Sequence, residues 1–273
     1  MMKTLKLMGM VMACAGFCAC SSSDDDSGTM VEEKTVTVNA VEGSNDKLTD
    51  NLLVYKLTSN DEAMVYGNNG EVVSVTIPTN IVWGGNTYKV TKIGAKAFYN
   101  LETLTCVAVP NSVKSVGDEA FYDCPELASI TISKNLKSIG DFAFENCRNL
   151  TSILIPNSVT SIGREAFYNC TGLTSVIVPY NVAILEESVF HNCSGLTSVT
   201  IPNSVTKIES EVFYGCIVLK DIYMQAATPP KSCRPPYGYV FDDYSATIHV
   251  PSGCKAIYSK TYPWSEFKNI VES

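Results

Sequence analysis

The sequence predicts an α+β repeat solenoid, a right-handed coil of short parallel strands with a β-hairpin cap at its N-terminal end and a second cap at its C-terminal end. Two regularities predict this fold. A unit of 23 residues recurs through the middle of the chain, and five cysteines keep the same interval: Cys124, Cys147, Cys170, Cys193 and Cys216. Such periodicity is typical of arrays in which stacked units bury apolar residues that one unit alone would expose.

Length and composition agree with a folded, acidic protein. The chain has 273 residues, of which 45% are hydrophobic, enough for a sizeable core. Its 28 acidic residues outnumber its 20 basic residues, so the formal net charge is −8. Nucleic acids and anionic lipid surfaces both require clustered Lys or Arg. We therefore expect neither of them as a partner.

Residues 1–19 are predicted to be a secretory signal peptide. Two lysines precede an apolar run that ends in small residues, and this run is too short for a permanent membrane span. The junction between Ala19 and Cys20 resembles a bacterial lipoprotein processing site, which implies that Cys20 is lipidated and begins the mature protein. Cys14 is the alternative lipidation site.

Residues 20–34 are predicted to form the lipidated cysteine and a disordered tether. Three serines and three aspartates follow Cys20, and such a polar stretch cannot bury itself. The pattern is similar to the surface-export signal of lipoproteins in Bacteroides-type bacteria. This resemblance implies a lipid-anchored protein of the outer membrane, exposed at the cell surface, that contacts the membrane only through its anchor.

Residues 74–219 contain the repeats. The three clearest copies are TSILIPNSVTSIGREAFYNCTGL, TSVIVPYNVAILEESVFHNCSGL and TSVTIPNSVTKIESEVFYGCIVL. Each copy begins with a pattern such as Leu196, Val199 and Ile201, whose alternation predicts a half-buried strand that ends at a proline. A second short extended segment follows. Ala166 and Phe167 then predict a single helical turn. The first copy carries a nine-residue insertion around residues 81–88.

The repeat itself resembles a known family. L-x-x-L-x-L at a period of about 20 to 29 residues is the leucine-rich-repeat signature. The form IPxSVTxIGxxAFxxC resembles the BspA-like leucine-rich-repeat family of bacterial surface proteins, which are mainly adhesins and interaction proteins. The resemblance implies a leucine-rich-repeat coil with the same kind of function.

Both ends of such a coil require caps, because the terminal copies would otherwise expose core residues. Residues 35–73 are the predicted N-terminal cap, with a hairpin formed by Leu53–Leu57 and residues 63–66. Residues 220–273 are the predicted C-terminal cap, with a strand at residues 246–250. The residues expected to cover the last coil are Tyr258, Trp264, Phe267 and Ile270.

The five regularly spaced cysteines are interpreted as buried, reduced thiols. Neighbouring strands lie about 4.8 Å apart, but stacked side chains point in parallel, whereas a disulfide requires converging Cβ vectors. A zinc site likewise requires four ligands around one point. Outside this column, Cys233 and Cys254 are either loose thiols or a disulfide pair, and Cys106 is expected to be an accessible thiol.

Catalysis has few candidate residues in this sequence. His191 and His249 are the only histidines, and His191 is expected on the surface. The chain shows no common nucleophile, metalloprotease or phosphate-loop motif. We therefore predict a protein that is not an enzyme, with no catalytic residues, no metal site and no cofactor.

Two surfaces are candidates for binding. Leu154 and Ile177 interrupt an otherwise polar, outward-facing strand column and form either a contact site or ordinary surface. The possible binding face comprises Leu154, Ile177, Thr131, Thr200, Tyr223 and Asp221. A possible aromatic strip comprises Tyr99, Tyr122, Tyr168 and Tyr214, whose rings either serve an interface or pack half-buried between coils.

The predicted function is that of a surface-anchored leucine-rich-repeat protein that mediates protein–protein interaction, with adhesion to host or bacterial surface proteins. The alternatives are a glycan-capture lipoprotein in nutrient uptake and a structural envelope component. Sugar rings stack on aromatic platforms, but Trp83 and Trp264 lie near opposite ends of the chain. An extracellular protein is therefore the expected partner, with a glycan as the alternative.

Overall fold

The protein is described from a computed structural model, which covers residues 35–40, 47–49, 52–59, 61–233 and 238–273. The predicted signal peptide, Cys20 and the tether lie outside these residues. The chain divides into two compact units, Met1–Met30 and Val31–Ser273, and everything below concerns the second. In the part of the chain that is described, no helix has the length and apolar character to cross a membrane.

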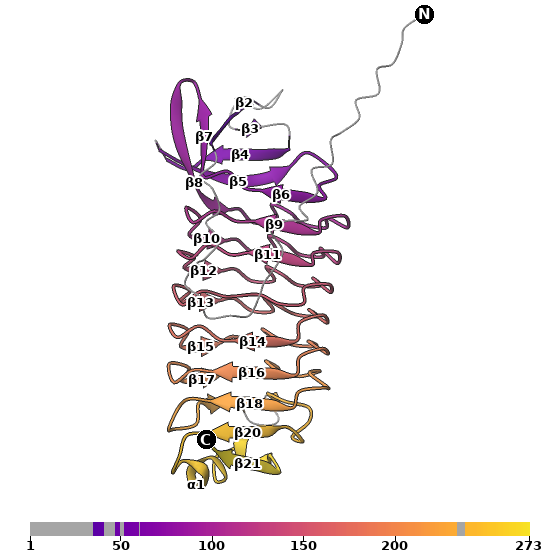
Figure 1. Ribbon diagram of the computed structural model, residues 1–273, viewed down its shortest axis with the longest axis vertical. Coiled ribbons are helices and arrows are strands. Elements are labelled where there is room, and N and C mark those ends of the chain that lie inside the picture. Colours follow the sequence, from indigo (N-terminus) through magenta and orange to yellow (C-terminus); the bar gives the residue numbers. More distant parts are fainter. Residues whose placement is uncertain (1–34, 41–46, 50–51, 60, 234–237) are drawn as a thin grey trace, which may run out of the picture. The chain divides into compact units, whose positions relative to one another are not determined.

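Short parallel strands stack in two columns along the molecule (Figure 1). The first column contains β6 (Ser74–Thr76), β9 (Cys106–Ala108), β11 (Ser129–Thr131), β14 (Ser175–Ile177), β16 (Ser198–Ile201), β18 (Asp221–Met224), β20 (Thr247–Val250) and β21 (Asn269–Glu272). The second contains the end of β8 (Asn86–Ile93), β10 (Ser115–Val116), β12 (Ser138–Ile139), β13 (Ser161–Ile162), β15 (Ile184–Leu185), β17 (Lys207–Ile208) and β19 (Lys231–Ser232). Equivalent residues of successive copies are paired, as Val176 is with Val199. The fold is therefore a parallel-strand β-solenoid of the leucine-rich-repeat type.

The predicted helical turn in each repeat is wrong. Glu165 and Asn169 flank residues 166–168 with φ angles of 53° and 55°, which an α-helix does not accommodate. The N–H of Phe167 donates to the carbonyl of Val189 in the next coil at 2.9 Å rather than within a helix. Among the described residues, only α1 (Lys255–Tyr258) and the 3-10 helix η1 (Trp264–Glu266) are helical. The α+β description therefore overstates the helix content.

The N-terminal region adds antiparallel strands to the second column. It contains β1 (Thr35–Thr37), β2 (Asn39–Ala40), β3 (Lys47–Thr49), β4 (Leu53–Leu57), β5 (Glu62–Asn68) and β7 (Asn80–Trp83). The antiparallel pairing of β4 with β5 confirms the predicted hairpin, and β5 pairs in parallel with β8. The insertion forms a second hairpin, β7–β8, whose turn uses Gly84 and Gly85 at positive φ. The role of this region as a cap stays a prediction.

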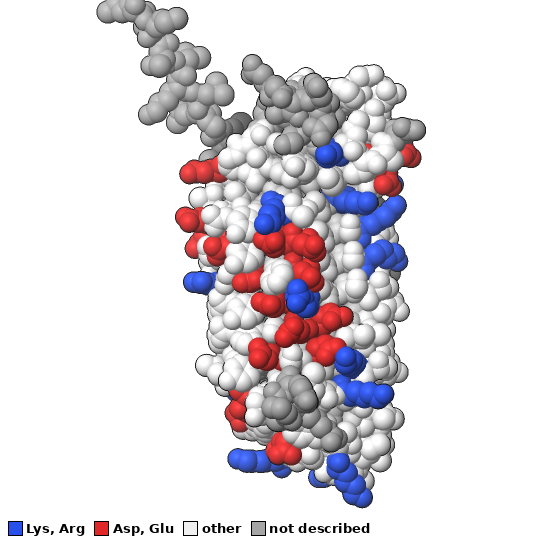
Figure 2. Space-filling view, turned by 180° about the vertical axis from the view of Figure 1, so that it is seen from behind, with Lys and Arg blue, Asp and Glu red and all other residues white. Residues whose placement is uncertain are grey.

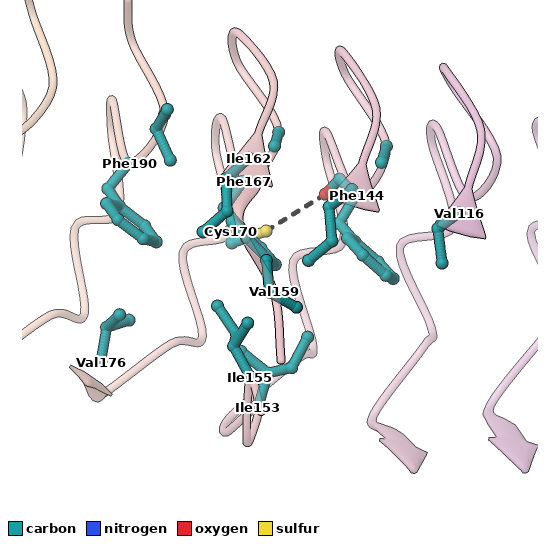
Figure 3. Close-up of a cluster of buried hydrophobic side chains, with 14 of the residues drawn as sticks. Val116, Phe144, Ile153, Ile155, Val159, Ile162, Phe167, Cys170, Val176 and Phe190 are labelled. Atoms are coloured by element: carbon teal, nitrogen blue, oxygen red, sulfur yellow. Dashed lines mark hydrogen bonds between the residues drawn. The ribbon is translucent and has the colours of Figure 1, made fainter. Parts of the chain in front are cut away.

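The core consists of side-chain ladders that run from coil to coil (Figure 3). Phe98, Phe121, Phe144, Phe167, Phe190 and Phe213 stack with ring centroids 5.0 to 5.8 Å apart. The five cysteines lie beside them, and each thiol contacts a phenylalanine carbonyl of the preceding coil at 3.0 to 3.3 Å. All five are free and buried, which confirms the reduced-thiol interpretation.

Strand pairing stops at one level in both columns, and we call this level the seam. The three-stranded sheet β11-β9-β6 ends there and β14 begins another, while in the second column β13 does not pair with β15. The turns between the columns stay connected, because the N–H groups of Phe167 and Asn169 donate to the next coil at 2.9 and 2.8 Å. The seam therefore interrupts the strands but not the turns.

The C-terminal region closes around aromatic residues. Tyr258 and Trp264 are fully buried, and Phe267 and Ile270 are nearly so, which confirms their predicted burial. The hydroxyl of Tyr258 donates to the carbonyl of Ala226 at 2.8 Å, and the indole N–H of Trp264 donates to that of Pro230 at 3.2 Å. Strand β20 confirms the extended segment predicted at residues 246–250.

Candidate binding surfaces

The outward side of the first strand column, which we call the strand face, carries large exposed side chains. Leu154 is 82% exposed and Ile177 is 61% exposed. Ile177, Thr200 and Tyr223 are aligned by the pairing of β14, β16 and β18. Leu154 lies outside any strand, at the seam. The structure therefore brings most of the predicted binding residues onto one column but leaves Leu154 outside its hydrogen-bonded ladder.

A polar and aromatic cluster extends this column beyond the repeats. His249 of β20 is paired with Tyr223, and the two rings stack with centroids 4.4 Å apart. The Nε2 atom of His249 lies 2.7 Å from a carboxylate oxygen of Asp221. The 23-residue spacing does not reveal this cluster, because 26 residues separate Tyr223 from His249.

The turns at residues 96–100, 119–123, 142–146, 165–169, 188–192 and 211–215 form a second surface, the turn face. Tyr99 and Tyr122 stack at 5.0 Å. His191 stacks on Tyr168 at 4.7 Å and lies 5.4 Å from Tyr214. The four predicted tyrosines therefore fall into two groups.

Two residues, Glu145 and His191, complete this strip. Glu145 occupies the strip position between Tyr122 and Tyr168, which separates the two aromatic groups. The side chain of His191 is only 17% exposed, and its Nδ1 atom lies 3.2 Å from a carboxylate oxygen of Glu211. His191 was expected on the surface; it lies on the turn face, but its ring is half-buried between Tyr168 and Tyr214.

Carboxylates crowd along the turn face, and Figure 2 shows them as a band on this side of the molecule. Burial, followed by the charge of Glu165, raises the pKa of Glu145 to about 7. Burial and the neighbouring Glu187 raise the pKa of Glu165, against the lowering effect of Arg164. The charge of Glu145 is the largest cause of the raised pKa of Tyr122. This face is therefore strongly acidic.

A shallow groove of about 540 Å³ follows the second strand column. The residues that line it include Gly117, Gly140, Gly163, Asp118, Asp141 and Glu186. The carboxylates of Asp118 and Asp141 accept the backbone N–H groups of the next coil at 3.0 and 2.8 Å. These two aspartates therefore have a structural role, because each joins its coil to the next.

Three further cysteines of the described residues lie outside the cysteine column. Cys233 and Cys254 are both unpaired, so the structure has two thiols and not the alternative disulfide. Cys106 is half-buried on β9. Within the described ranges, no group of three or more His, Cys, Asp or Glu side chains is arranged to hold a metal ion.

Comparison with known proteins identifies the repeats. Residues 91–220 match the BspA type leucine-rich-repeat region in six copies. A leucine-rich cell surface protein from Faecalibacterium prausnitzii A2-165 is 32% identical, with a TM-score of 0.61 over 70% of this chain and 57% of that protein. The chain thus spans little more than half the length of this relative. No curated protein matches the chain.

Two further solved structures resemble the chain. The leucine-rich-repeat protein TpLRR of T. pallidum is 27% identical, with a TM-score of 0.59 over 73% of this chain and 84% of that protein. A leucine-rich-repeat protein from Bacteroides ovatus ATCC 8483 is 23% identical, with a TM-score of 0.56 over 82% of this chain and 70% of that protein. At 23% identity, the similarity to the Bacteroides ovatus protein shows only a shared fold.

Proposed function

Because residues 91–220 of this chain belong to the BspA-type leucine-rich-repeat family, we propose that the protein is a surface-anchored interaction protein that adheres to host or bacterial surface proteins. Members of this family are typically cell-surface proteins, and their solenoids typically serve as binding scaffolds rather than enzymes. A lipid on Cys20 would hold the protein at the outer membrane, with the repeats facing outward.

The exposure of Leu154 and Ile177 is the observation that carries this proposal. Burying one such side chain against a partner stabilises a complex by about 1.5 to 3 kcal/mol. The aligned Thr200 and Tyr223 add hydrogen-bonding groups and an aromatic ring of the kind enriched at protein interfaces. The strand face thus combines an apolar centre with a polar continuation.

The alternative of glycan capture has less support. Trp264 is fully buried beneath the C-terminal region, so its ring cannot stack on a sugar. Trp83 is 39% exposed on the β7–β8 hairpin, far along the chain from the exposed aromatic residue Tyr223. A protein ligand therefore fits the strand face better than a sugar.

Adhesion of cells that display the full chain tests the proposal. Such cells should bind immobilised extracellular-matrix proteins, and a Leu154→Asp, Ile177→Asp double variant should weaken binding at least 100-fold, because two apolar contacts become charges. The matched control is Ile217→Asp, Val218→Asp, which changes two exposed residues outside the strands. Equal adhesion by both variants, or retention of polysaccharide alone, would reject the strand face as an adhesin surface.

The anchor is tested separately by metabolic labelling with a fatty acid. Cys20→Ala should abolish incorporation of the label and release the protein from the membrane fraction, whereas Cys14→Ala should leave both unchanged. If Cys14→Ala abolishes the label and Cys20→Ala does not, Cys14 is the lipidated residue.

A further inference from the structure

The strand face continues past the repeats onto β20. Ile177, Thr200, Tyr223 and His249 are successive partners across β14, β16, β18 and β20 (Figure 1). Neighbouring strands lie about 4.8 Å apart, so His249 lies about 14 Å from Ile177 along this column. A protein interface covers about 800 Å² on each side, which corresponds to a patch about 28 Å wide. An interface of this size that includes Ile177 is therefore wide enough to include His249.

The outward residues of these four strands carry few charges. They are Ser175, Ile177, Ser198, Thr200, Asp221, Tyr223, Thr247 and His249. Of these eight, only Asp221 and His249 can be charged between pH 5 and 8, and histidine is the side chain that ordinarily titrates in this range. The net charge of this surface therefore depends on the proton of His249.

Asp221 and His249 form a pair on this surface. The Nε2 atom of His249 lies 2.7 Å from a carboxylate oxygen of Asp221. The imidazole ring also stacks on the ring of Tyr223, with 17° between the two planes. The side chains of Asp221 and His249 are 39% and 21% exposed, so a partner that covers them removes both from water.

The strands on either side of β20 determine which charges His249 meets. Strand β18 presents Asp221 and the phenol of Tyr223. Strand β21 presents Val271 as the partner of His249, and its one carboxylate, Glu272, accepts the N–H of the first residue of α1 at 2.9 Å. Within the described residues, His249 is the one ion-pair partner of Asp221. The charge of Asp221 is therefore compensated when His249 is protonated and uncompensated when it is neutral.

The protonation state of His249 changes the free energy of covering this pair. An uncompensated carboxylate costs more free energy to remove from water than a hydrogen-bonded ion pair does. Above the range in which histidine titrates, a partner buries the charge of Asp221 alone. Below that range, it buries a compensated pair. An apolar partner surface should therefore bind more tightly in acid.

We propose that an uncharged, apolar surface of the partner protein covers the Asp221–His249 pair, and that adhesion strengthens when His249 gains a proton. This regulation rests on the proposed function, which supplies the partner. The strand face favours this occupant, because Leu154 and Ile177 are apolar and exposed and the next residue along the column, Thr200, is uncharged. A cationic partner surface predicts the opposite sign, since it gains from the uncompensated charge of Asp221.

Adhesion at two pH values tests this regulation. Cells that display the full chain should bind immobilised extracellular-matrix proteins about fivefold more tightly at pH 5.5 than at pH 8. His249→Gln should abolish this difference, because glutamine is neutral at both values. Weaker wild-type binding at pH 5.5 would indicate a cationic partner surface and overturn the proposal.

The matched control is His191→Gln, since His191 is the other histidine of the chain and lies on the turn face. This variant should keep the pH difference. The pKa of Glu145, about 7, lies in the same range, and both variants leave this residue unchanged. Loss of the pH difference in both histidine variants would overturn the proposal, because the effect would then not depend on the strand face.

Asp221→Asn should reverse the sign of the pH effect. At pH 8 the neutral asparagine and imidazole leave no charge to bury, whereas at pH 5.5 the imidazolium has lost its counterion. Binding by this variant should therefore be about fivefold weaker at pH 5.5 than at pH 8. A purely structural role of Asp221 would instead lower binding equally at both values, and that result would overturn the proposal.

Retention of the purified full chain on uncharged phenyl-agarose separates this regulation from the adhesin function. Retention should increase from pH 8 to pH 5.5 more for the wild type and His191→Gln than for His249→Gln. That result without cell adhesion would support the regulation and reject the adhesin. Adhesion to which His249 contributes nothing at either pH would reject the regulation and leave the adhesin standing. Circular dichroism establishes that each variant is folded.

Discussion

At the scale of single residues, the cysteine column shows why one side chain recurs. Cys170 is fully buried, so its position requires a small apolar group. Its thiol also lies 3.1 Å from the carbonyl of Phe144, where an alanine would leave that carbonyl without this donor. Burial raises the pKa of the Cys170 thiol well above its ordinary value, so it stays protonated and able to donate. Cysteine satisfies both requirements.

Replacing Cys170 with alanine should lower the free energy of unfolding by about 1 to 2 kcal/mol, through the lost thiol contact and a small cavity. Urea denaturation followed by circular dichroism measures the change. Cys254→Ala is the control, since this thiol is half-exposed and lies 3.8 Å from the carbonyl of Ser252. A Cys170→Ala variant as stable as this control would show that the position needs only a small side chain.

Glu145 makes stability depend on pH. Its pKa rises from 4.5 to about 7 on folding, so the folded state favours the protonated form. The stabilisation from this proton is fully present below pH 4.5 and is lost as the pH rises through 7. The titratable groups that face the Glu145 carboxyl group are Glu119, Asp123, Glu165 and the hydroxyl of Tyr122.

Glu145→Gln should therefore raise the free energy of unfolding at pH 8 by about 1 kcal/mol, a figure reduced for solvent screening, and should change it little at pH 4. Thermal melts at the two pH values measure the difference, with Glu71→Gln as the control. A larger gain at pH 4 than at pH 8 would contradict the assigned direction of the pKa shift.

At the scale of elements, glycines set how closely successive coils approach. A Cβ atom at Gly140 would lie 2.6 Å from the backbone nitrogen of Asp118 and 2.7 Å from the carbonyl carbon of Gly117. Backbone atoms cannot yield as a flexible side chain can. The second strand column thus depends on a bare Cα at this position in the copies that contain Gly117, Gly140 and Gly163.

Gly140→Ala should lower the free energy of unfolding by about 1 to 3 kcal/mol because of this overlap. Gly67→Ala, where a Cβ meets nothing within 4 Å, should leave stability unchanged or raise it by about 0.5 kcal/mol. Chemical denaturation of the two variants side by side measures the contrast. Equal stability would mean that the coils separate at negligible cost.

Sequence alone predicted most of the strands but not the turns; the strand expected at residues 152–154 is absent. The alternation of Val199 and Ile201 reveals a half-buried strand directly. The adjacent pair Ala166-Phe167 fits a helical turn equally well, and only hydrogen bonds to the next coil decide between them. Those bonds join residues 22 apart and leave no local pattern.

The candidate surfaces were predictable to different degrees for the same reason. Tyr99 and Tyr122 keep the 23-residue interval and were predicted to align, whereas His249 follows its strand partner Tyr223 by 26 residues and was not. The sequence did not predict the acidic band on the turn face, because Glu145, Glu165 and Glu187 occupy different positions of the repeat. Only stacking of the coils brings them together.

At the scale of the whole molecule, the seam divides the strand columns into two blocks joined by turns and core. Phe167 and Phe190 still stack across it at 5.5 Å, and the Cys193 thiol still contacts the Phe167 carbonyl at 3.2 Å. The missing element is the strand ladder between β13 and β15. Leu154 also lies at this level, so the apolar centre of the strand face coincides with the interruption.

Amide hydrogen exchange should locate the seam. Residues 161–163 and 184–186 should exchange at least tenfold faster than the equivalent residues 138–140 and 207–209, because β13 and β15 each lack a paired neighbour on one side whereas β12 and β17 are paired on both. A tenfold difference corresponds to about 1.4 kcal/mol in the free energy of local opening. Uniform protection along the four segments would exclude a seam in solution.

The residue at position 186 offers a way to close the seam. Glu186 stands where the preceding copy has Gly163, whose added Cβ would lie 2.5 Å from the backbone nitrogen of Asp141. Glu186→Gly removes the corresponding Cβ, so β13 and β15 should pair and exchange at residues 184–186 should slow at least fivefold. Glu209→Gly is the matched control, because Glu209 carries a Cβ at the same repeat position and β17 nevertheless pairs with β15. If both variants exchange alike, the Cβ of Glu186 does not hold the coils apart, and the seam originates on the Leu154 side.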